Sequence, residues 1–497
     1  MNLKLEGFKK EIKGKKAAVI GVGISNRPLI KWLVGLGAEV TAFDRNNADD
    51  PAISAVMEEF SSEGIEVSWS LGEGYLNALS DQKFDYVFKT PKMRYETPEL
   101  QAAKAKGSVL TTEMELFMSI CPCRIFGITG SDGKTTTTTL VSEMLKAGGF
   151  KVWLGGNIGT PLLSEVFNMK EDDMVVLELS SFQLMGMRRS ADVAIVTNVT
   201  PNHLDFHKDY DEYIDSKKNI FLYASPCDKT VLNAACDITY NMKDDSRGKI
   251  DFFALSSSDA SKAGDDVLFG KAYTEDGYLI YEKDGKKEKI VAEKDIFIPG
   301  KHNVENYLAA ICAVEGFVSP DAMAKVAREF KGVPHRIELI RELDGVRYFN
   351  SSIDTSPNRT INTMKALSGR GEKGVLICGG ADKKCIYDGL GDAILNVSDR
   401  IVIYGSNAPF VREILEKEAA GREYTFIEIG EGTKDVYEFP ETREAVVGYM
   451  KEALAKAREL ARPGELVIMS NIGTSYDHFR HFEHRGDLFK ELVNAMT

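Results

Sequence analysis

Residues 124–135, RIFGITGSDGKT, run from a short apolar strand through a glycine turn to a lysine and a threonine that open a helix. Small residues in such a turn let backbone N–H groups converge on phosphate oxygens, and the helix N-terminus adds positive potential. Lys134 can then reach the β- and γ-phosphates of a nucleotide, and the Thr135 hydroxyl can bind Mg²⁺. A turn that served only chain reversal would not need a lysine directly after its glycine. The stretch therefore predicts a phosphate-binding loop, in a shortened form because Ile128 stands where the general loop has glycine.

Two polar residues follow other predicted strands of the same block. Glu178 ends MVVLE, residues 174–178, and His203 follows VAIVTNVT, residues 193–200. Ligands of open α/β sheets gather at the carboxyl ends of the strands. Carboxylate oxygens, and less often imidazole nitrogens, bind Mg²⁺. Either residue alone could be an ordinary loop residue, but beside the glycine loop the two predict a metal–ATP site.

The α/β pattern starts three times along the 497 residues. It begins at AAVIGVGIS (17–25), again at RIFGIT (124–129) and a third time at VRYFNSS (346–352). Amphipathic segments separate these buried-strand runs from further strands, which predicts parallel sheets. The predicted class is α/β, with a Rossmann-like first domain, a P-loop ATPase-like central domain with a mixed sheet, and a Rossmann-like third domain. The expected ranges of the three domains are 1–112, 113–332 and 333–497.

Two stretches of the central domain depart from this pattern. Residues 270–298 alternate polar and apolar side chains, with turn signals at Asp276-Gly277 and Asp284-Gly285, and so predict antiparallel hairpins at the domain edge. Residues 241–266 are polar without clear periodicity, which predicts a loop-rich insertion.

The formal net charge of -13 argues against a broad nucleic-acid surface and against binding to anionic membranes. No apolar run approaches the roughly 20 residues of a membrane helix, and the basic N-terminus lacks the apolar core of a signal peptide. The seven cysteines are scattered, and Cys121 and Cys123 around a proline form neither a C-x-x-C redox pair nor a zinc site. We expect a cytoplasmic protein that acts on small molecules, with no nucleic acid and no membrane insertion.

The first glycine turn, Gly21-Val22-Gly23-Ile24-Ser25-Asn26, approximates the dinucleotide fingerprint, and Asp44 ends the next strand. Asn26 replaces the third glycine, whose role is close packing of helix on strand. A nicotinamide-dependent oxidoreductase is therefore one alternative, although it leaves the lysine-bearing loop unexplained.

An ordered set of motifs resembles the Mur ligases and covers all three predicted domains. The motifs are TGSDGKT (129–135), LELSSFQL (177–184), VTNVTPNHLDFH (196–207), Tyr213-x-x-x-Lys217, GKHNVENYLAA (300–310) and Pro334-His335-Arg336. The last segment, SYDHFRHFEHRGDLF (475–489), is similar to that of the family member that adds D-glutamate.

The resemblance implies ATP-dependent ligation of D-glutamate to UDP-N-acetylmuramoyl-L-alanine in peptidoglycan precursor synthesis. The substrate carboxylate would attack the γ-phosphate of ATP, and the amine of D-glutamate would then attack the acyl phosphate. The resemblance also implies two Mg²⁺ ions, a carbamylated Lys217, and two small-molecule substrates besides ATP. A monomer is expected.

The resemblance further implies a role for each matching residue. Lys134, His203 and Lys217 would be catalytic, and Thr135, Glu178, His203 and Lys217 would bind or support metal. ATP would contact Gly130, Ser131, Asp132, Gly133, Lys134, Thr135, Thr136, Asn306 and Arg336. The UDP-linked substrate would contact Gly23, Ile24, Ser25, Asp44, Arg45, Asn157, Ser180 and Gln183. D-Glutamate would contact Lys383, Ser475, Tyr476 and Phe482.

Three positions depart from the family pattern. Ser351 follows Asn350 where aspartate is frequent, and Asp354 is the nearby residue that could compensate. Lys92 stands where glycine is usual, either to meet the diphosphate or as a solvated lysine. Asn471-Ile472-Gly473 replaces a proline-alanine sequence beside the amino-acid pocket.

Two alternatives on the same scaffold stay open at this point. One is another ligase of the superfamily, a neighbouring Mur ligase or folylpolyglutamate synthase. The other is an amidotransferase partner, although the cysteine spacing does not supply the four-cysteine zinc insertion of that class.

Overall fold

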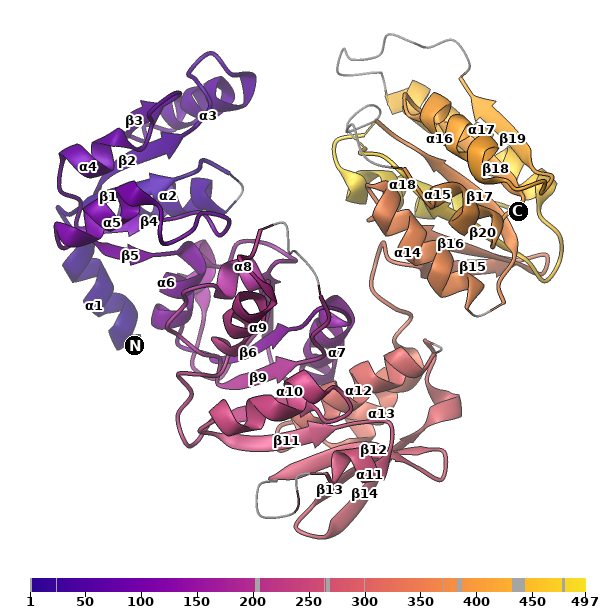
Figure 1. The fold of residues 1–497 in the computed structure, drawn as a ribbon, viewed down its shortest axis with the longest axis horizontal. Coiled ribbons are helices and arrows are strands. Elements are labelled where there is room, and N and C mark those ends of the chain that lie inside the picture. The colour runs from indigo at the N-terminus through magenta and orange to yellow at the C-terminus, as the bar shows by residue number, and fades with distance from the viewer. Residues whose placement is uncertain are drawn as a thin grey trace. The chain divides into compact units, whose positions relative to one another are not determined.

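The computed structural model describes residues 2–23, 25–201, 206–262, 264, 269–298, 300–369, 371–381, 387–430, 443–475 and 479–497. The chain forms two compact units, Met1–Phe330 and Lys331–Thr497. The first unit contains a five-stranded and a nine-stranded sheet, and the second contains a six-stranded sheet (Figure 1). Among the described residues, no helix combines the length and apolarity needed to cross a membrane. The α/β class with three sheets is confirmed, and the predicted boundaries of the three domains stay a prediction.

The first sheet is parallel, in the order β3-β2-β1-β4-β5. Its strands are β1 (Lys16–Ile20), β2 (Glu39–Asp44), β3 (Ser68–Leu71), β4 (Tyr86–Phe88) and β5 (Val109–Thr111). Its helices are α1 (Leu3–Ile12), α2 (Asn26–Gly35), α3 (Pro51–Ser62), α4 (Asn77–Asp81), α5 (Pro98–Ala105) and α6 (Glu113–Ile120). The direction of winding reverses between β1 and β4, so a ligand crevice is expected beyond their carboxyl ends.

The central sheet has the order β14-β13-β12-β11-β10-β9-β6-β8-β7. Its strands are β6 (Arg124–Thr129), β7 (Val152–Gly156), β8 (Met174–Glu178), β9 (Val193–Val196), β10 (Lys229–Asn233), β11 (Lys249–Phe253), β12 (Gly270–Glu275), β13 (Tyr278–Lys283) and β14 (Lys286–Ala292). Its α-helices are α7 (Lys134–Ala147), α8 (Ser181–Leu184), α9 (Tyr210–Lys218), α10 (Asp237–Asn241), α11 (Ser257–Ala260), α12 (Lys301–Val314) and α13 (Pro320–Glu329). Short 3-10 turns lie at η1 (Leu163–Asn168), η2 (Met242–Asp245) and η3 (Glu293–Asp295).

The strands β12, β13 and β14 form two antiparallel hairpins at one edge of this sheet, which confirms the prediction for residues 270–298 and makes the sheet mixed. The prediction of a loop-rich insertion at 241–266 is wrong in its middle, because β11 pairs in parallel with β10 and β12 there. Asp251 interrupts the apolar pattern of β11 and obscured the strand. Its fully buried carboxylate pairs with Lys229 Nζ at 3.2 Å and accepts from the Tyr281 hydroxyl at 3.0 Å.

The sheet of the second unit has the order β15-β16-β20-β17-β18-β19, with β15 and β16 antiparallel and the other pairs parallel. Its strands are β15 (Glu338–Leu343), β16 (Val346–Ser351), β17 (Gly374–Gly379), β18 (Arg400–Tyr404), β19 (Thr425–Ile429) and β20 (Leu466–Ser470). Its helices are α14 (Pro357–Ser368), α15 (Leu390–Leu395), α16 (Ala408–Glu418), α17 (Arg443–Leu460) and α18 (Phe482–Ala495). Buried apolar clusters lie on both faces of this sheet. A sheet that packs an apolar cluster on each of its two faces is typical of a doubly wound domain.

Candidate active site

The glycine loop of the central sheet follows β6 and opens α7. Gly130 has φ 148°, and a Cβ there would lie 1.9 Å from Thr197 Oγ1. Gly133 has φ 78°, and a Cβ there would lie 2.4 Å from Asn306 Oδ1. The loop needs glycine at both positions, for the backbone conformation and for the close approach of its neighbours. The predicted nucleotide contact Asn306, from α12, is thereby brought against the loop.

The loop is held from the segment that follows β9. The Asp132 backbone N–H donates to Asn198 Oδ1 at 2.8 Å, and Thr197 Oγ1 donates to the Asp132 carbonyl oxygen at 2.6 Å. The Ser131 backbone N–H donates to the Asn198 carbonyl oxygen at 2.9 Å. Thr197 and Asn198 were not among the predicted site residues, although both lie in the motif VTNVTPNHLDFH. These bonds hold the loop in one conformation.

Gly133→Ala is expected to weaken ATP binding. An alanine in this left-handed conformation costs roughly 1–2 kcal/mol, and its Cβ must also displace Asn306. Gly149→Ala is the matched control, because Gly149 has φ 89° and nothing within 4 Å of its Cβ position. Both variants should lower the thermal unfolding midpoint, whereas only Gly133→Ala should raise the KM for ATP, by about tenfold. An equal KM in the two variants would show that the approach of Asn306 does not matter.

Lys134 and Thr135 begin α7. The N-cap residue of this helix is Gly133, which has no side chain to accept from the N–H groups of the first turn. Lys134 Nζ donates to the carbonyl oxygens of Gly130 at 3.0 Å and Ser131 at 2.9 Å, so the ammonium lies over the loop. Thr135 is buried, and Thr136 and the exposed Asp132 complete the loop rim. Backbone N–H groups and a positive charge therefore meet at one place, which suits phosphate.

Helix α9 places Lys217 against the same loop. Lys217 is 1% exposed, and its Nζ donates to the Gly130 carbonyl oxygen at 2.8 Å and lies 4.5 Å from the centre of the Tyr213 ring. The Tyr213 hydroxyl is 2.9 Å from Ser131 Oγ. Burial, with a smaller contribution from the Lys134 charge, lowers the pKa of Lys217 to about 7. A substantial fraction of this amine is therefore neutral near physiological pH.

Glu178, at the end of β8, has the features of a cation ligand. It is 2% exposed, its Oε1 accepts from Asn157 Nδ2 at 2.8 Å, and its Oε2 has no hydrogen-bond partner among the residues that the structure describes. A buried carboxylate oxygen without a partner is costly unless a cation or water binds it, so Glu178 fits a divalent metal. His203 lies outside the described residues. Within the described part of the chain, no group of three or more His, Cys, Asp and Glu side chains is arranged to hold a metal.

Ser180 and Gln183, predicted to face the muramoyl substrate, form a capping box at the start of α8. Gln183 Oε1 accepts from the backbone N–H and the hydroxyl of Ser180, both at 3.0 Å. Their predicted contact with substrate stays a prediction.

Lys92 lies in the loop before α5. Its ammonium is 5.3 Å from the centre of the ring of Phe182, which belongs to α8. Lys92 is exposed, and its ammonium lies within cation–π distance of this ring.

The first glycine turn differs from a dinucleotide fingerprint in its contacts. Asn26 is buried, and its Nδ2 donates to the carbonyl oxygens of Ile20 at 3.0 Å and Gly21 at 2.9 Å. Asp44 Oδ2 accepts from the Val22 backbone N–H at 2.9 Å. The amide of Asn26, in the place of the third glycine of the fingerprint, thus holds the turn through carbonyl oxygens instead of allowing the close packing of helix on strand.

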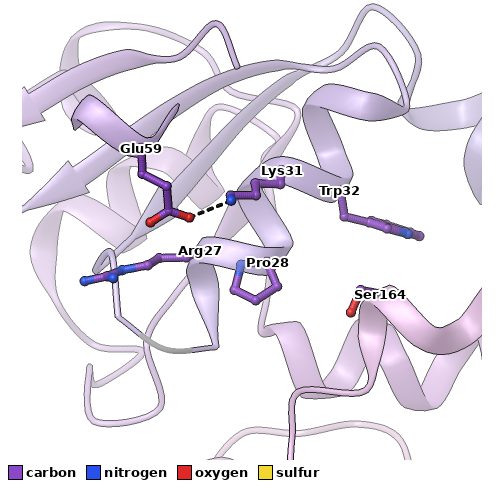
Figure 2. A pocket seen from close by; sticks show the side chains of 6 residues that line it. All are labelled: Arg27, Pro28, Lys31, Trp32, Glu59 and Ser164. Atoms are coloured by element: carbon purple, nitrogen blue, oxygen red, sulfur yellow. Dashed lines mark hydrogen bonds and ion pairs between the residues drawn. The ribbon is translucent and has the colours of Figure 1, made fainter. Parts of the chain in front are cut away.

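Of the residues predicted for the UDP-linked substrate, Gly23 and Ser25 belong to this turn and Asp44 bonds to it, whereas Asn157, Ser180 and Gln183 belong to the central sheet and its helices. Gly23, Ser25 and Arg45 are exposed, Asp44 is half-buried, and Ile24 lies outside the described residues. A cavity of about 570 Å³ lies beside α2, lined by Arg27, Pro28, Lys31, Trp32, Glu59 and Ser164 (Figure 2). Lys31 Nζ is 2.5 Å from Glu59 Oε1, so its charge is neutralised within the lining. None of these lining residues was among the predicted site residues.

In the second unit, Ser475 is buried and Phe482 begins α18, with its ring centre 5.9 Å from that of His335. Burial, together with the Lys490 charge, lowers the pKa of His335 and so favours the neutral ring. Arg336 is exposed. Lys383 and Tyr476 lie outside the described residues.

The expectation that Asp354 could replace the aspartate missing at position 351 is not supported. Asp354 is buried, and its Oδ2 accepts from the hydroxyls of Thr363 at 2.8 Å and Ser470 at 2.7 Å. The carboxylate therefore connects α14 and β20 inside the domain. The departure at Asn471 also has a structural role, because its Oδ1 accepts from the Tyr404 hydroxyl at 2.7 Å.

Comparison with known proteins agrees with this geometry. Residues 128–314 match the Mur ligase middle domain. Along its whole length, the chain is 46% identical to the UDP-N-acetylmuramoylalanine–D-glutamate ligase of Acetivibrio thermocellus, and each chain covers 100% of the other. The identity to the enzyme of the same name from Ruminiclostridium cellulolyticum is 44%, again with full coverage of both chains. The chain belongs to the UDP-N-acetylmuramoylalanine–D-glutamate ligase family.

Solved structures of other Mur ligases share the fold of this family member. The UDP-N-acetylmuramate–alanine ligase MurC of Thermotoga maritima has a TM-score of 0.53 at 18% identity, with 97% of this chain and 99% of that chain covered. MurF of Acinetobacter baumannii has a TM-score of 0.52 at 14% identity, with 98% and 92% covered. For this D-glutamate ligase family member, the comparisons identify the family and fold, whereas the roles of individual side chains rest on the geometry above.

Proposed function

We propose that the protein ligates D-glutamate to UDP-N-acetylmuramoyl-L-alanine with ATP, forming an amide bond in peptidoglycan precursor synthesis. Membership of the family is the observation that carries this function. The buried loop with Lys134 and Lys217 on the same Gly130 carbonyl oxygen is the geometry that supports it. A cytoplasmic location and a monomeric state are part of the proposal.

The reaction consists of two displacements. A carboxylate oxygen of the muramoyl substrate attacks the γ-phosphorus, the bond to the β-phosphate oxygen breaks, and ADP leaves. The neutral amine of D-glutamate then attacks the acyl carbon, phosphate leaves, and the amine gives a proton to solvent. Lys134 and the N-terminus of α7 neutralise charge that develops on the phosphoryl oxygens. Bound Mg²⁺, held by Thr135 and Glu178, would supply further charge neutralisation.

Lys217 is proposed to carry a carbamate. Its neutral amine attacks the carbon of CO₂, a nitrogen–carbon bond forms, and one proton goes to solvent. The pKa of about 7 makes this addition possible near neutral pH, where an ordinary lysine is protonated. The product is an anionic oxygen ligand on a long stem, able to support a second Mg²⁺ beside the glycine loop.

D-Glutamate, and not L-glutamate, is expected to support phosphate release. The proposed pocket combines Ser475, Phe482 and Lys383, and a charged hydrogen bond to the side-chain carboxylate contributes on the order of 1.5–3 kcal/mol. A difference of this size in binding free energy between the two amino acids corresponds to a preference of about tenfold or more for D-glutamate. The test is phosphate release with UDP-N-acetylmuramoyl-L-alanine, ATP and Mg²⁺, screened across amino acids of both hands. Faster release with L-glutamate or a diamino acid would overturn the specificity, and no release with any amino acid would overturn the ligase function.

A further inference from the structure

The loop 89–97, between β4 and α5, contacts the central sheet through a forked ion pair. Arg94 Nη1 is 3.1 Å from Glu212 Oε2, and Arg94 Nη2 is 2.5 Å from Glu212 Oε1. Arg94 Nη1 also donates to the Phe206 carbonyl oxygen at 3.3 Å. The Arg94 hydrogen bonds are the largest cause that lowers the pKa of Glu212 to about 2, so the pair stays ionised at neutral pH. Two parallel bonds fix the orientation of both side chains.

Three further contacts of this loop accompany the ion pair. A Cβ on Gly186 would lie 2.2 Å from Tyr95 Cε2, so the ring is in close contact with the backbone after α8. Lys92 lies over the Phe182 ring of α8. At its other end the loop reaches the first glycine turn, where Thr90 Cβ is 3.6 Å from the Cβ position of Gly21. The loop therefore connects the turn proposed for UDP with helices of the central sheet.

Glu212 belongs to the first turn of α9. Its backbone N–H donates to Asp209 Oδ1 at 2.8 Å, and its Oε2 accepts from the Lys208 backbone N–H at 2.7 Å. The next residue, Tyr213, reaches Ser131 of the glycine loop, and Lys217 one turn later reaches Gly130. Residues 213 and 217 share a helix face. The position of the first turn thus determines where both side chains meet the glycine loop.

We propose that Arg94 is a positioning residue, which holds α9 through Glu212 so that Tyr213 and Lys217 stay on the glycine loop. Through it, loop 89–97 couples the turn proposed for the UDP moiety to the lysine at the phosphate site. The inference rests on the proposed function. An exposed ion pair contributes little by itself, but the Arg94 and Glu212 side chains are only 32% and 24% exposed, and the pair is bidentate. A displacement of about 1 Å at a catalytic group is enough to lower a rate substantially.

The experiment measures kcat and both KM values, with ATP and UDP-N-acetylmuramoyl-L-alanine, for the full chain. Arg94→Ala should lower kcat by about tenfold, with the KM for ATP within about twofold. Arg94→Lys should recover part of the loss, since it keeps the charge without the fork. Glu96→Gln is the control, because it removes only the exposed partner 3.5 Å from Arg94 Nε. The double variant Arg94→Ala/Glu212→Gln should be no slower than the slower single variant.

A second readout does not depend on turnover. In [¹³C]bicarbonate, the NMR signal of a lysine carbamate should be weaker in Arg94→Ala than in Glu96→Gln. Wild-type kcat and signal in Arg94→Ala, or fully multiplicative effects in the double variant, would overturn the inference. If Arg94→Ala does not fold, Arg94→Lys and Glu212→Gln decide the question by the same measurements. A wild-type chain that releases no phosphate with any amino acid would instead refute the proposed function.

Discussion

Lys134→Ala is expected to abolish phosphate release while the chain stays folded. The side chain is half-buried at the N-terminus of α7, and its Nζ donates to the carbonyl oxygens of Gly130 and Ser131 in the loop. Bound phosphate would offer this ammonium stronger partners than those carbonyls. Removing one preorganised charge from a site that stabilises a phosphoryl transition state costs roughly 10²–10³-fold in kcat. The measurement is single-turnover phosphate release at saturating ATP.

Lys146→Ala is the matched control for this variant. Lys146 lies in the last turn of the same helix and pairs with Glu143 at 2.8 Å on the surface. It should leave kcat unchanged and lower the unfolding midpoint only slightly. If a folded Lys134→Ala variant released phosphate at a rate near that of Lys146→Ala, the assignment of the glycine loop to ATP would be wrong.

Lys217→Ala is expected to lose most activity, and short carboxylates such as acetate or formate should restore part of it. The substitution removes the nitrogen that bonds Gly130 and the carbamate proposed to form on it, and a small anion can occupy the vacated space. Lys218→Ala is the control, because Lys218 pairs with Asp215 at 3.1 Å and Asp245 at 3.0 Å and does not reach the loop. A fully active Lys217→Ala variant would refute the metal-support role.

The pH dependence of this site has a definite sign. The pKa of Lys217 is lowered, so the neutral amine that adds CO₂ becomes more abundant as pH rises through about 7. At limiting bicarbonate, the activity should therefore rise between about pH 6 and pH 8 and then level off. If the lysine had an ordinary pKa, the activity would continue to rise up to about pH 10. In Lys134→Ala, carbamate formation on Lys217 should begin at higher pH, because the Lys134 charge is one cause of the lowered pKa of Lys217. The NMR signal of the lysine carbamate formed from [¹³C]bicarbonate measures this change in pH dependence even in a variant that has lost turnover.

Local patterns were sufficient for most elements of the fold. The strand into glycine turn into helix at β6 and α7, the hairpins of β12–β14 and the helical segment with Tyr213 and Lys217 are all present. Each depends on apolar periodicity or turn residues within a few positions, which the chain shows directly. The strand β11 was missed because buried Asp251 broke that periodicity, and its partner Lys229 lies more than twenty residues earlier.

The candidate site was predictable in its residue types and not in its energetics. The sequence by itself determined that a lysine follows a glycine turn at the carboxyl end of a strand, because conformation and spacing are local properties of the chain. Only the tertiary structure decided that Lys217 is buried against Gly130, that a Glu178 oxygen has no hydrogen-bond partner in the described part of the chain, and that Arg94 holds Glu212 across 118 positions of sequence. The physical reason is that pKa values and ion-pair energies depend on burial and on charges brought together by folding. Neither quantity is a property of any short segment.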